Sequence, residues 1–79
     1  MATYQYAEYL TNLPHSAFDA TYEAGSMAPF SGIYRCMGCH IEITSEQAGS
    51  LSSLHHPQHR PDQGKIRWRL IAFADHRPK

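Results

Sequence analysis

The chain has 79 residues, which predicts one small domain spanning residues 1–79. Hydrophobic residues make up 42% of the chain and charged residues 18%, so the composition excludes a disordered acidic or basic tail. The formal net charge is zero, which excludes a bulk electrostatic attraction to nucleic acid or to an anionic membrane.

Residues 1–31 are predicted to form an N-terminal arm that packs on the rest of the domain. Its first part, residues 3–13, fits two patterns. Tyr4 and Tyr6 alternate with polar residues as in a strand. A helix is predicted instead by the i, i+3, i+4, i+7 spacing of the apolar residues Tyr6, Tyr9, Leu10 and Leu13. A helix and a strand therefore both remain open for this segment.

The second part of the arm is predicted to be a strand followed by a loop. Residues 18–23 alternate apolar and polar side chains, which is typical of a half-buried strand. Residues 24–32 are rich in Gly, Ser and Pro, which favours a loop. We place the boundary between the arm and the following module in this loop.

Residues 32–76 are predicted to form a β-rich module, followed by a loose tail at residues 77–79. Two β-rich stretches, residues 33–35 and 41–44, flank the cysteine pair and predict a hairpin. The polar residues 45–54 that follow predict at most a short helical turn. The fold is therefore expected to be mainly β, with a small α+β fold as the alternative.

The clearest strand pattern runs from Lys65 to Asp75. One face of this strand is predicted to carry Ile66, Trp68, Leu70, Ala72 and Ala74. The other face is predicted to carry Lys65, Arg67, Arg69, Ile71, Phe73 and Asp75. Trp68 is in phase with the aliphatic residues, so we expect it to lie in the core.

The two cysteines and a histidine cluster predict a metal site. Cys36 and Cys39 form a CxxC pair, and sixteen residues separate Cys39 from the pair His56 and His59. Two thiolates and two imidazoles form the tetrahedral donor set of structural zinc. We therefore predict one Zn²⁺ per chain, with Gly38 relieving the tight turn between the cysteines.

The assignment of the histidine ligands has an alternative. His55 and His59 are separated by three residues, which falls within the spacing of C2H2 zinc fingers. His56 and His59 instead repeat the spacing of the CxxC pair. Pro57 disfavours the regular helix on which the wider pair would converge, so we prefer His56 and keep His55 as its alternative.

Other interpretations of the cysteine pair remain open. Residues 36–40 match the C-x-x-C-H attachment motif of c-type haem, which would require export. The cysteines could also form a free or redox pair, although no βαβ pattern surrounds them. A catalytic zinc would need an open coordination position, and no HExxH spacing provides a neighbouring base. We therefore predict that the protein is not an enzyme.

The cellular location follows from two further features. No run of 18 apolar residues is present, so no membrane span is expected. The first residues lack the basic and apolar regions of a secretory signal, which predicts a cytoplasmic protein. In a reducing compartment a CxxC pair is more often a metal or redox site than a disulfide.

The metal module resembles a known group of proteins. The resemblance rests on residues 32–39 (Gly-Ile-Tyr-Arg-Cys-Met-Gly-Cys), Glu42-Ile43, a short polar loop, the His-Pro-Gln-His segment and Ile66-x-Trp68. These features are similar to small zinc-ribbon proteins of bacteria and their phages, in particular to a group called protein L. The resemblance extends over about residues 28–76 and implies a zinc ribbon. It implies no activity. Many ribbons have glycine where this chain has His40, and a second CxxC where it has the histidine pair.

Two classes of partner fit the sequence. Residues 1–34 have three acidic and no basic residues, and residues 35–79 have seven basic and four acidic residues, so the parts carry −3 and +3. This asymmetry predicts either docking of one part on the other or a basic face for a partner. The tyrosines of the arm are expected to pack on the module, or to form a surface for a partner or a homodimer.

We therefore predict a non-enzymatic binding or adaptor module with a structural zinc site and a protein partner. The alternative is a nucleic-acid-binding regulator that uses the basic strand face at Lys65, Arg67 and Arg69.

Overall fold

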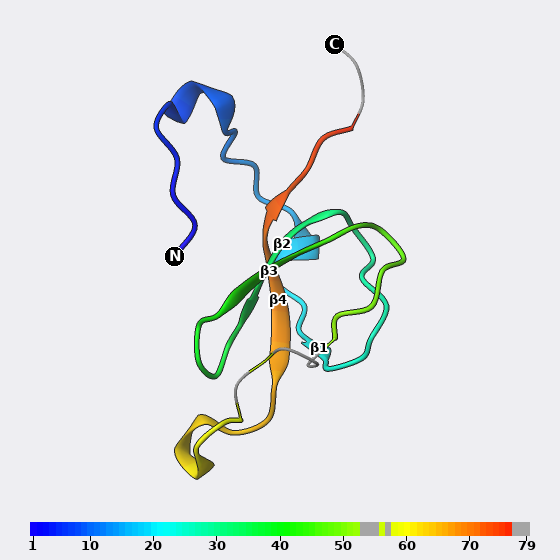
Figure 1. Ribbon diagram of the computed structural model, residues 1–79. Helices are drawn as coiled ribbons and strands as arrows, with labels where there is room; N and C mark the ends of the chain where they lie inside the picture. Colours follow the sequence, from blue (N-terminus) through cyan, green and yellow to red (C-terminus); the bar gives the residue numbers. More distant parts are fainter. Residues whose placement is uncertain (53–55, 57, 77–79) are drawn as a thin grey trace.

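The computed structural model describes residues 1–52, 56 and 58–76, and it shows one small antiparallel sheet with single 3-10 turns (Figure 1). The strand order is β1-β4-β2-β3. In chain order the elements are η1 (Ala7–Tyr9), η2 (Ser16–Phe18), β1 (Tyr22–Glu23), β2 (Gly32–Cys36), β3 (Glu42–Ser45), η3 (Pro61–Gln63) and β4 (Arg67–Phe73). The prediction of a mainly β, zinc-ribbon-like fold is confirmed.

Strands β2 and β4 form the centre of the sheet. Their β-branched and aromatic residues suit a pleated surface that is buried on one side. Tyr34 lies opposite Leu70, and Cys36 lies opposite Trp68, so the four side chains share one face, which we call the inner face. All four are fully or almost fully buried. The opposite side is the outer face of the sheet.

Side chains of β4 alternate between the inner and the outer face, and this alternation shifts by one residue after Leu70. The prediction that Ala72 shares a face with Trp68 and Leu70 is therefore wrong. A register shift next to Tyr34 leaves Ile71 without a direct partner and places Ala72 opposite Ile33, on the outer face. Phe73 follows on the inner side, where its ring lies 5.3 Å from that of Phe30. The bulge adds one residue to β4, and local periodicity does not reveal such an insertion.

The β2–β3 hairpin carries the cysteine pair at its turn. Tyr34 pairs with Ile43, and the turn is closed by hydrogen bonds from the Cys36 amide to the Ile41 carbonyl and from the His40 amide to the Cys36 carbonyl, both 2.8 Å. The predicted hairpin around the CxxC pair is therefore present.

The inner face is covered by two loops rather than by a helix. The Gly25 and Leu51 segments exchange backbone hydrogen bonds of 2.7 and 2.8 Å, and Ala28 bonds to Gly49 and Ala48 in the same manner. This pairing brings Ala28 and Leu51 over the sheet, where both are completely buried. The buried core consists of Ala17, Ala28, Tyr34, Cys36, Leu51, Trp68 and Leu70.

The N-terminal arm contributes to the core only through its second half. Ala17 is buried, and Phe18 and Tyr22 pack against the core. Residues 1–16 are exposed and form an arch outside the core, shown in dark blue in Figure 1. The arch contains one 3-10 turn, so neither the predicted helix nor the predicted strand over residues 3–13 is found.

Three of the tyrosines expected in the core therefore lie outside it. Tyr4, Tyr6 and Tyr9 are all more than half exposed, because the arch forms no strand of the sheet and none of its side chains enters the core. Tyr22 and Tyr34 do contribute to the core.

Truncation of two neighbouring β4 side chains tests the assignment of the two faces. Leu70 is 1% exposed and Ile71 is 36% exposed. We expect Leu70→Ala to lower the free energy of unfolding by about 2–5 kcal/mol, because it leaves a cavity in a small core. Ile71→Ala should lower it by less than about 1 kcal/mol. Denaturant unfolding followed by Trp68 fluorescence measures both values, and equal losses would contradict the assignment.

Candidate metal centre

Four of the predicted ligands meet at one end of the sheet. Cys36 ends β2, Cys39 lies in the hairpin turn, and His56 and His59 precede η3. Their ligand atoms all lie within 4.8 Å of one another. Figure 1 shows η3 (yellow) at the same end of the molecule as the hairpin turn (green). The hairpin and the histidine segment, which are distant in sequence, therefore share one site.

The distances within the cluster fit a tetrahedral ion. Cys36 Sγ lies 3.4 Å from His59 Nε2, and Cys39 Sγ lies 3.1 Å from His56 Nε2. Zinc bonds of about 2.3 Å to sulfur and about 2.0–2.1 Å to nitrogen, at a tetrahedral angle, separate the two donors by roughly 3.5 Å. The four residues can therefore bind one metal ion, and two thiolates with two imidazoles are a donor set that zinc prefers.

The local environment of Cys36 favours the thiolate that a metal requires. Burial of the thiol raises its pKa, but the backbone amides of Cys39 and Gly38 act in the opposite direction. His56 and the backbone of Arg67 add to this effect, and together these groups lower the pKa of Cys36 to about 6. Backbone N–H groups that face the sulfur stabilise its negative charge.

The hairpin turn depends on an unusual backbone conformation at His40. Its φ is +69°, in the left-handed region that favours glycine. Glycine, which many zinc ribbons have at this position, adopts such a φ without the strain that a histidine incurs. The His40 side chain is exposed, and it is not among the four clustered ligands.

Gly38 is required for a reason other than the predicted one. Its φ is not positive, so conformational freedom does not explain the glycine. A Cβ at this position would lie 2.6 Å from His59 Cε1 and 2.6 Å from the Gln63 carbonyl oxygen. The glycine therefore allows the histidine segment to approach the cysteine turn closely.

The backbone of a following turn orients His59. Its Nδ1 lies 2.8 Å from the carbonyl oxygen of Gly64, which fits donation by an Nδ1–H group and leaves Nε2 free to face Cys36. Gly64 adopts a φ of +72°, which brings its carbonyl into this position directly after η3. The sequence pattern does not reveal that this turn orients a metal ligand.

Aromatic side chains complete the surroundings of the cluster. The His56 ring lies 4.7 Å from the His59 ring and 5.5 Å from the Trp68 ring, the latter edge-to-face. Trp68 is completely buried, and its Nε1 has no hydrogen-bond partner among the described residues. The metal cluster is therefore continuous with the core of the inner face.

The other predicted site residues have different surroundings. His55 lies outside the described residues. Lys65 and Arg67 are exposed, as a surface for nucleic acid requires. Arg69 instead contacts the arm, because its Nε donates a 2.5 Å hydrogen bond to the Phe18 carbonyl. The three basic residues therefore do not form one free stripe.

Comparison with known proteins supports the resemblance seen in the sequence. A stretch of 54 residues, 68% of the chain, is 43% identical to the protein named Protein L of Escherichia coli. The stretch covers 61% of that protein, which is less than two thirds of its length. No protein-family model and no solved structure matches the chain. Within the described ranges, no helix has the length and apolar character needed to cross a bilayer. The chain is thus similar to Protein L over about two thirds of its own length.

Replacement of the ligands should unfold the module. We expect Cys36→Ser and His59→Ala to abolish stoichiometric metal binding, because each removes a ligand. The module should then unfold, because structural zinc supplies on the order of 10 kcal/mol of folding free energy in small domains. Circular dichroism and metal analysis of purified protein provide the measurement. His40→Gly is the matched control, since it removes a neighbouring imidazole and relieves a positive φ. It should retain both metal and fold, and a folded, metal-bound His59→Ala would refute the assignment.

Gly38→Ala should weaken metal binding without removing a ligand. The added methyl group displaces His59, and a change of this kind typically lowers metal affinity by about 10- to 100-fold. Competition with a chromophoric chelator measures the affinity. Gly25→Ala is the control, because its φ of +88° makes the substitution strained while no atom lies within 4 Å of the new methyl group. It should lower stability and leave the metal affinity unchanged.

Proposed function

We propose that the cluster holds one zinc ion as a structural staple and that the protein is a non-enzymatic binding or adaptor module. The observation that carries the proposal is the set of four mutually close protein ligands. A tetrahedral ion with four protein ligands has no open position for water or substrate, which favours a structural over a catalytic role.

The packing around the cluster favours a structural role for the metal. In the histidine segment, the described residues 56 and 58–64 include none that is buried. Apolar packing therefore contributes little to holding this segment against the hairpin. Metal bonds to His56 and His59 would provide that attachment, and they would close the end of the sheet where Trp68 lies.

The exposed arch supports a role in binding another protein. Monomeric proteins rarely display many large apolar side chains together without a function. Along the arch these exposed side chains are Tyr4, Tyr6, Tyr9, Leu10 and Leu13. Tyrosine is enriched at protein interfaces, and the Tyr6 and Tyr9 rings already contact each other edge-to-face at 5.6 Å. The arch is therefore the surface that we assign to a partner.

The nucleic-acid alternative has weaker support. Lys65 and Arg67 are exposed, but the Arg69 guanidinium is engaged with the Phe18 carbonyl and lies 3.7 Å from the Asp19 carboxylate. A zero net charge adds no long-range attraction to phosphates.

Paired binding assays distinguish the two functions. We expect immobilised protein to retain a partner from a lysate of the source organism, and the variant Tyr6→Ser/Leu10→Ser/Leu13→Ser to lose that partner while keeping its metal. Labelled DNA and RNA should show no salt-dependent binding. If instead nucleic acid binds and the variant Lys65→Gln/Arg67→Gln/Arg69→Gln loses it, the adaptor proposal fails.

A further inference from the structure

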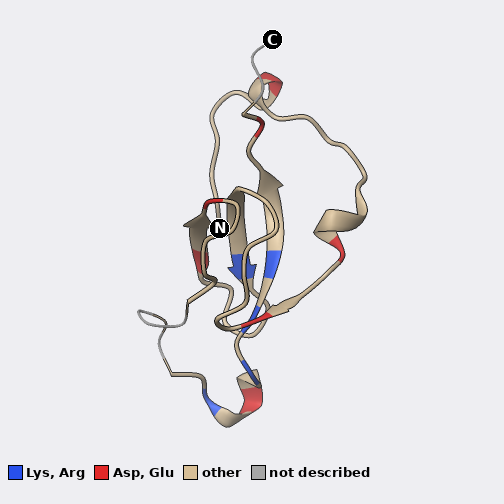
Figure 2. Cartoon of the chain, turned by 90° about the vertical axis from the view of Figure 1, so that its right-hand side faces the viewer, with Lys and Arg blue, Asp and Glu red and all other residues tan. Residues whose placement is uncertain are grey.

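The outer face of the sheet brings two arginines together. Arg35 on β2 lies directly opposite Arg69 on β4. Basic residues on these neighbouring strands can be followed in Figure 2 (blue). Like charges at directly opposed positions of an antiparallel pair repel each other and destabilise it. We therefore expect nearby anionic groups to neutralise the positive charge of such a pair.

Only one of the two arginines has such a partner among the described residues. Arg69 contacts the Phe18 carbonyl and the Asp19 carboxylate. The Nε of Arg35 is buried, and within residues 1–52, 56 and 58–76 it has no hydrogen-bond partner. Glu42 lies opposite Arg35 on β3, but its carboxylate faces the Met1 amine at 3.9 Å and forms no ion pair with Arg35.

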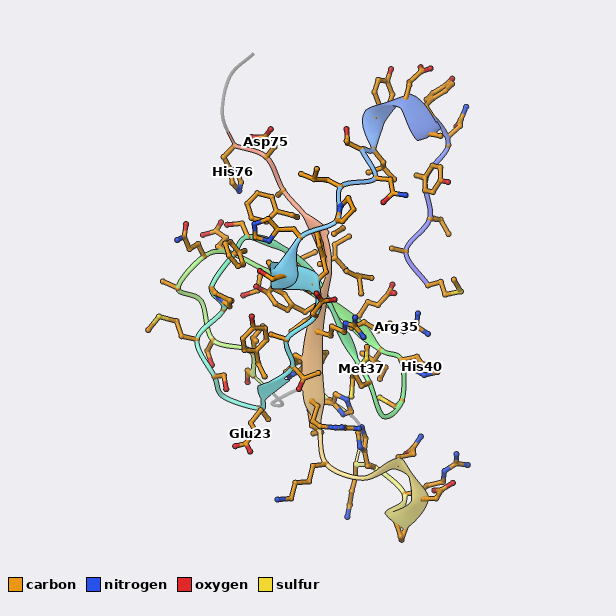
Figure 3. The ribbon with its side chains drawn as sticks, turned by 180° about the vertical axis from the view of Figure 1, so that it is seen from behind. Glu23, Arg35, Met37, His40, Asp75 and His76 are labelled. Atoms are coloured by element: carbon orange, nitrogen blue, oxygen red, sulfur yellow. The ribbon has the colours of Figure 1, made fainter. Side chains whose placement is uncertain are left out.

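A cavity of about 680 Å³ lies over these arginines. Its walls come from the outer face of the sheet, from the hairpin turn and from the arch at residues 11–15. The polar side chains that line it are Thr11, Asn12, His15, Asp19, Arg35, His40 and Arg69. Figure 3 shows Arg35 and His40 along the hairpin on the same side of the ribbon as Met37. Cavities of about 300–1,000 Å³ are typical of small-molecule sites.

We propose that this cavity binds a small organic phosphate, with Arg35 as its main ligand and Arg69 as the second. A guanidinium presents its N–H groups in a planar fork that matches phosphate oxygens, and two adjacent forks suit an anion with several oxygens. Among the described residues the Nε of Arg35 has no hydrogen-bond acceptor, and a phosphate in the cavity would place anionic oxygens beside this guanidinium. Leu13, Phe18 and Ile71 in the same walls can contact the organic part of the ligand.

The size of the site favours a small molecule over a nucleic-acid chain. The arch crosses the outer face beside the arginines and limits the cavity. Lys65 and Arg67, which would extend a basic track along β4, do not line it. The Asp19 carboxylate, which is 77% exposed, competes with the ligand for Arg69, so the site should bind phosphate only moderately by itself.

The cavity and the metal cluster share the hairpin turn. Met37 and His40 line the cavity, while Cys36 and Cys39 of the same turn point to the metal cluster. The ligand site therefore requires the folded, metal-loaded protein, and binding should raise its thermal stability by mass action.

Titrations of the metal-loaded protein with inorganic phosphate, adenosine monophosphate and adenosine test the proposal by NMR. We expect both phosphates to shift the Nε–H resonances of Arg35 and Arg69, adenosine monophosphate to bind more tightly than phosphate, and adenosine to have no effect. Arg35→Gln should weaken binding at least about tenfold, since it removes a charge-assisted contact. Asp19→Asn should strengthen binding, because it removes the competing carboxylate.

Arg67→Gln is the matched control, because it removes the same charge from the neighbouring strand β4, at a position that does not line the cavity. It should leave the affinity unchanged within about twofold. Equal weakening by Arg67→Gln and Arg35→Gln would overturn the proposal, because it would indicate general charge attraction. Absence of shifts up to tens of millimolar phosphate would also overturn it. So would binding of a single-stranded oligonucleotide that depends on Lys65 and Arg67 and is not displaced by adenosine monophosphate.

Discussion

Two sulfur–nitrogen contacts connect the hairpin to the segment before β4, and the rest of the module depends on them. They pair Cys36 with His59 and Cys39 with His56 at distances that match a shared tetrahedral ion. The histidine segment has no buried side chain of its own within the described residues, so apolar packing cannot replace these contacts. A metal bond at this point would act on the whole module, because Cys36 is also a core residue opposite Trp68.

The two faces of the sheet have different roles. The inner face combines the core with the candidate metal cluster, so an ion bound there would stabilise the core directly. The outer face carries opposed arginines beneath an exposed arch, an arrangement that adds no apolar burial to the core. Surfaces of this kind are where a small domain can bind ligands or partners without loss of its core.

The arch that we propose as the surface for a partner lies outside the core. Residues 1–16 are exposed, and the first side chain of the chain that is buried is Ala17. The hydrogen bond between Arg69 and Phe18 attaches the end of the arch to the central strand. Apolar residues of the arch thus lie beside the outer face of the sheet, close to the cavity over Arg35.

The sequence by itself determined the features that depend on short spacing. These are the CxxC turn, the flanking hairpin, the β4 strand and the histidine pair, and each is encoded within a few neighbouring residues. Only the tertiary structure decided the change of phase at Ile71, the need for Gly38 beside His59 and the pairing of Arg35 with Arg69. These depend on which distant segments meet, and a local pattern contains no information on such long-range packing. The exposure of Tyr4, Tyr6 and Tyr9 was decided in the same way, because an amphipathic spacing buries a residue only where the fold supplies an apolar partner.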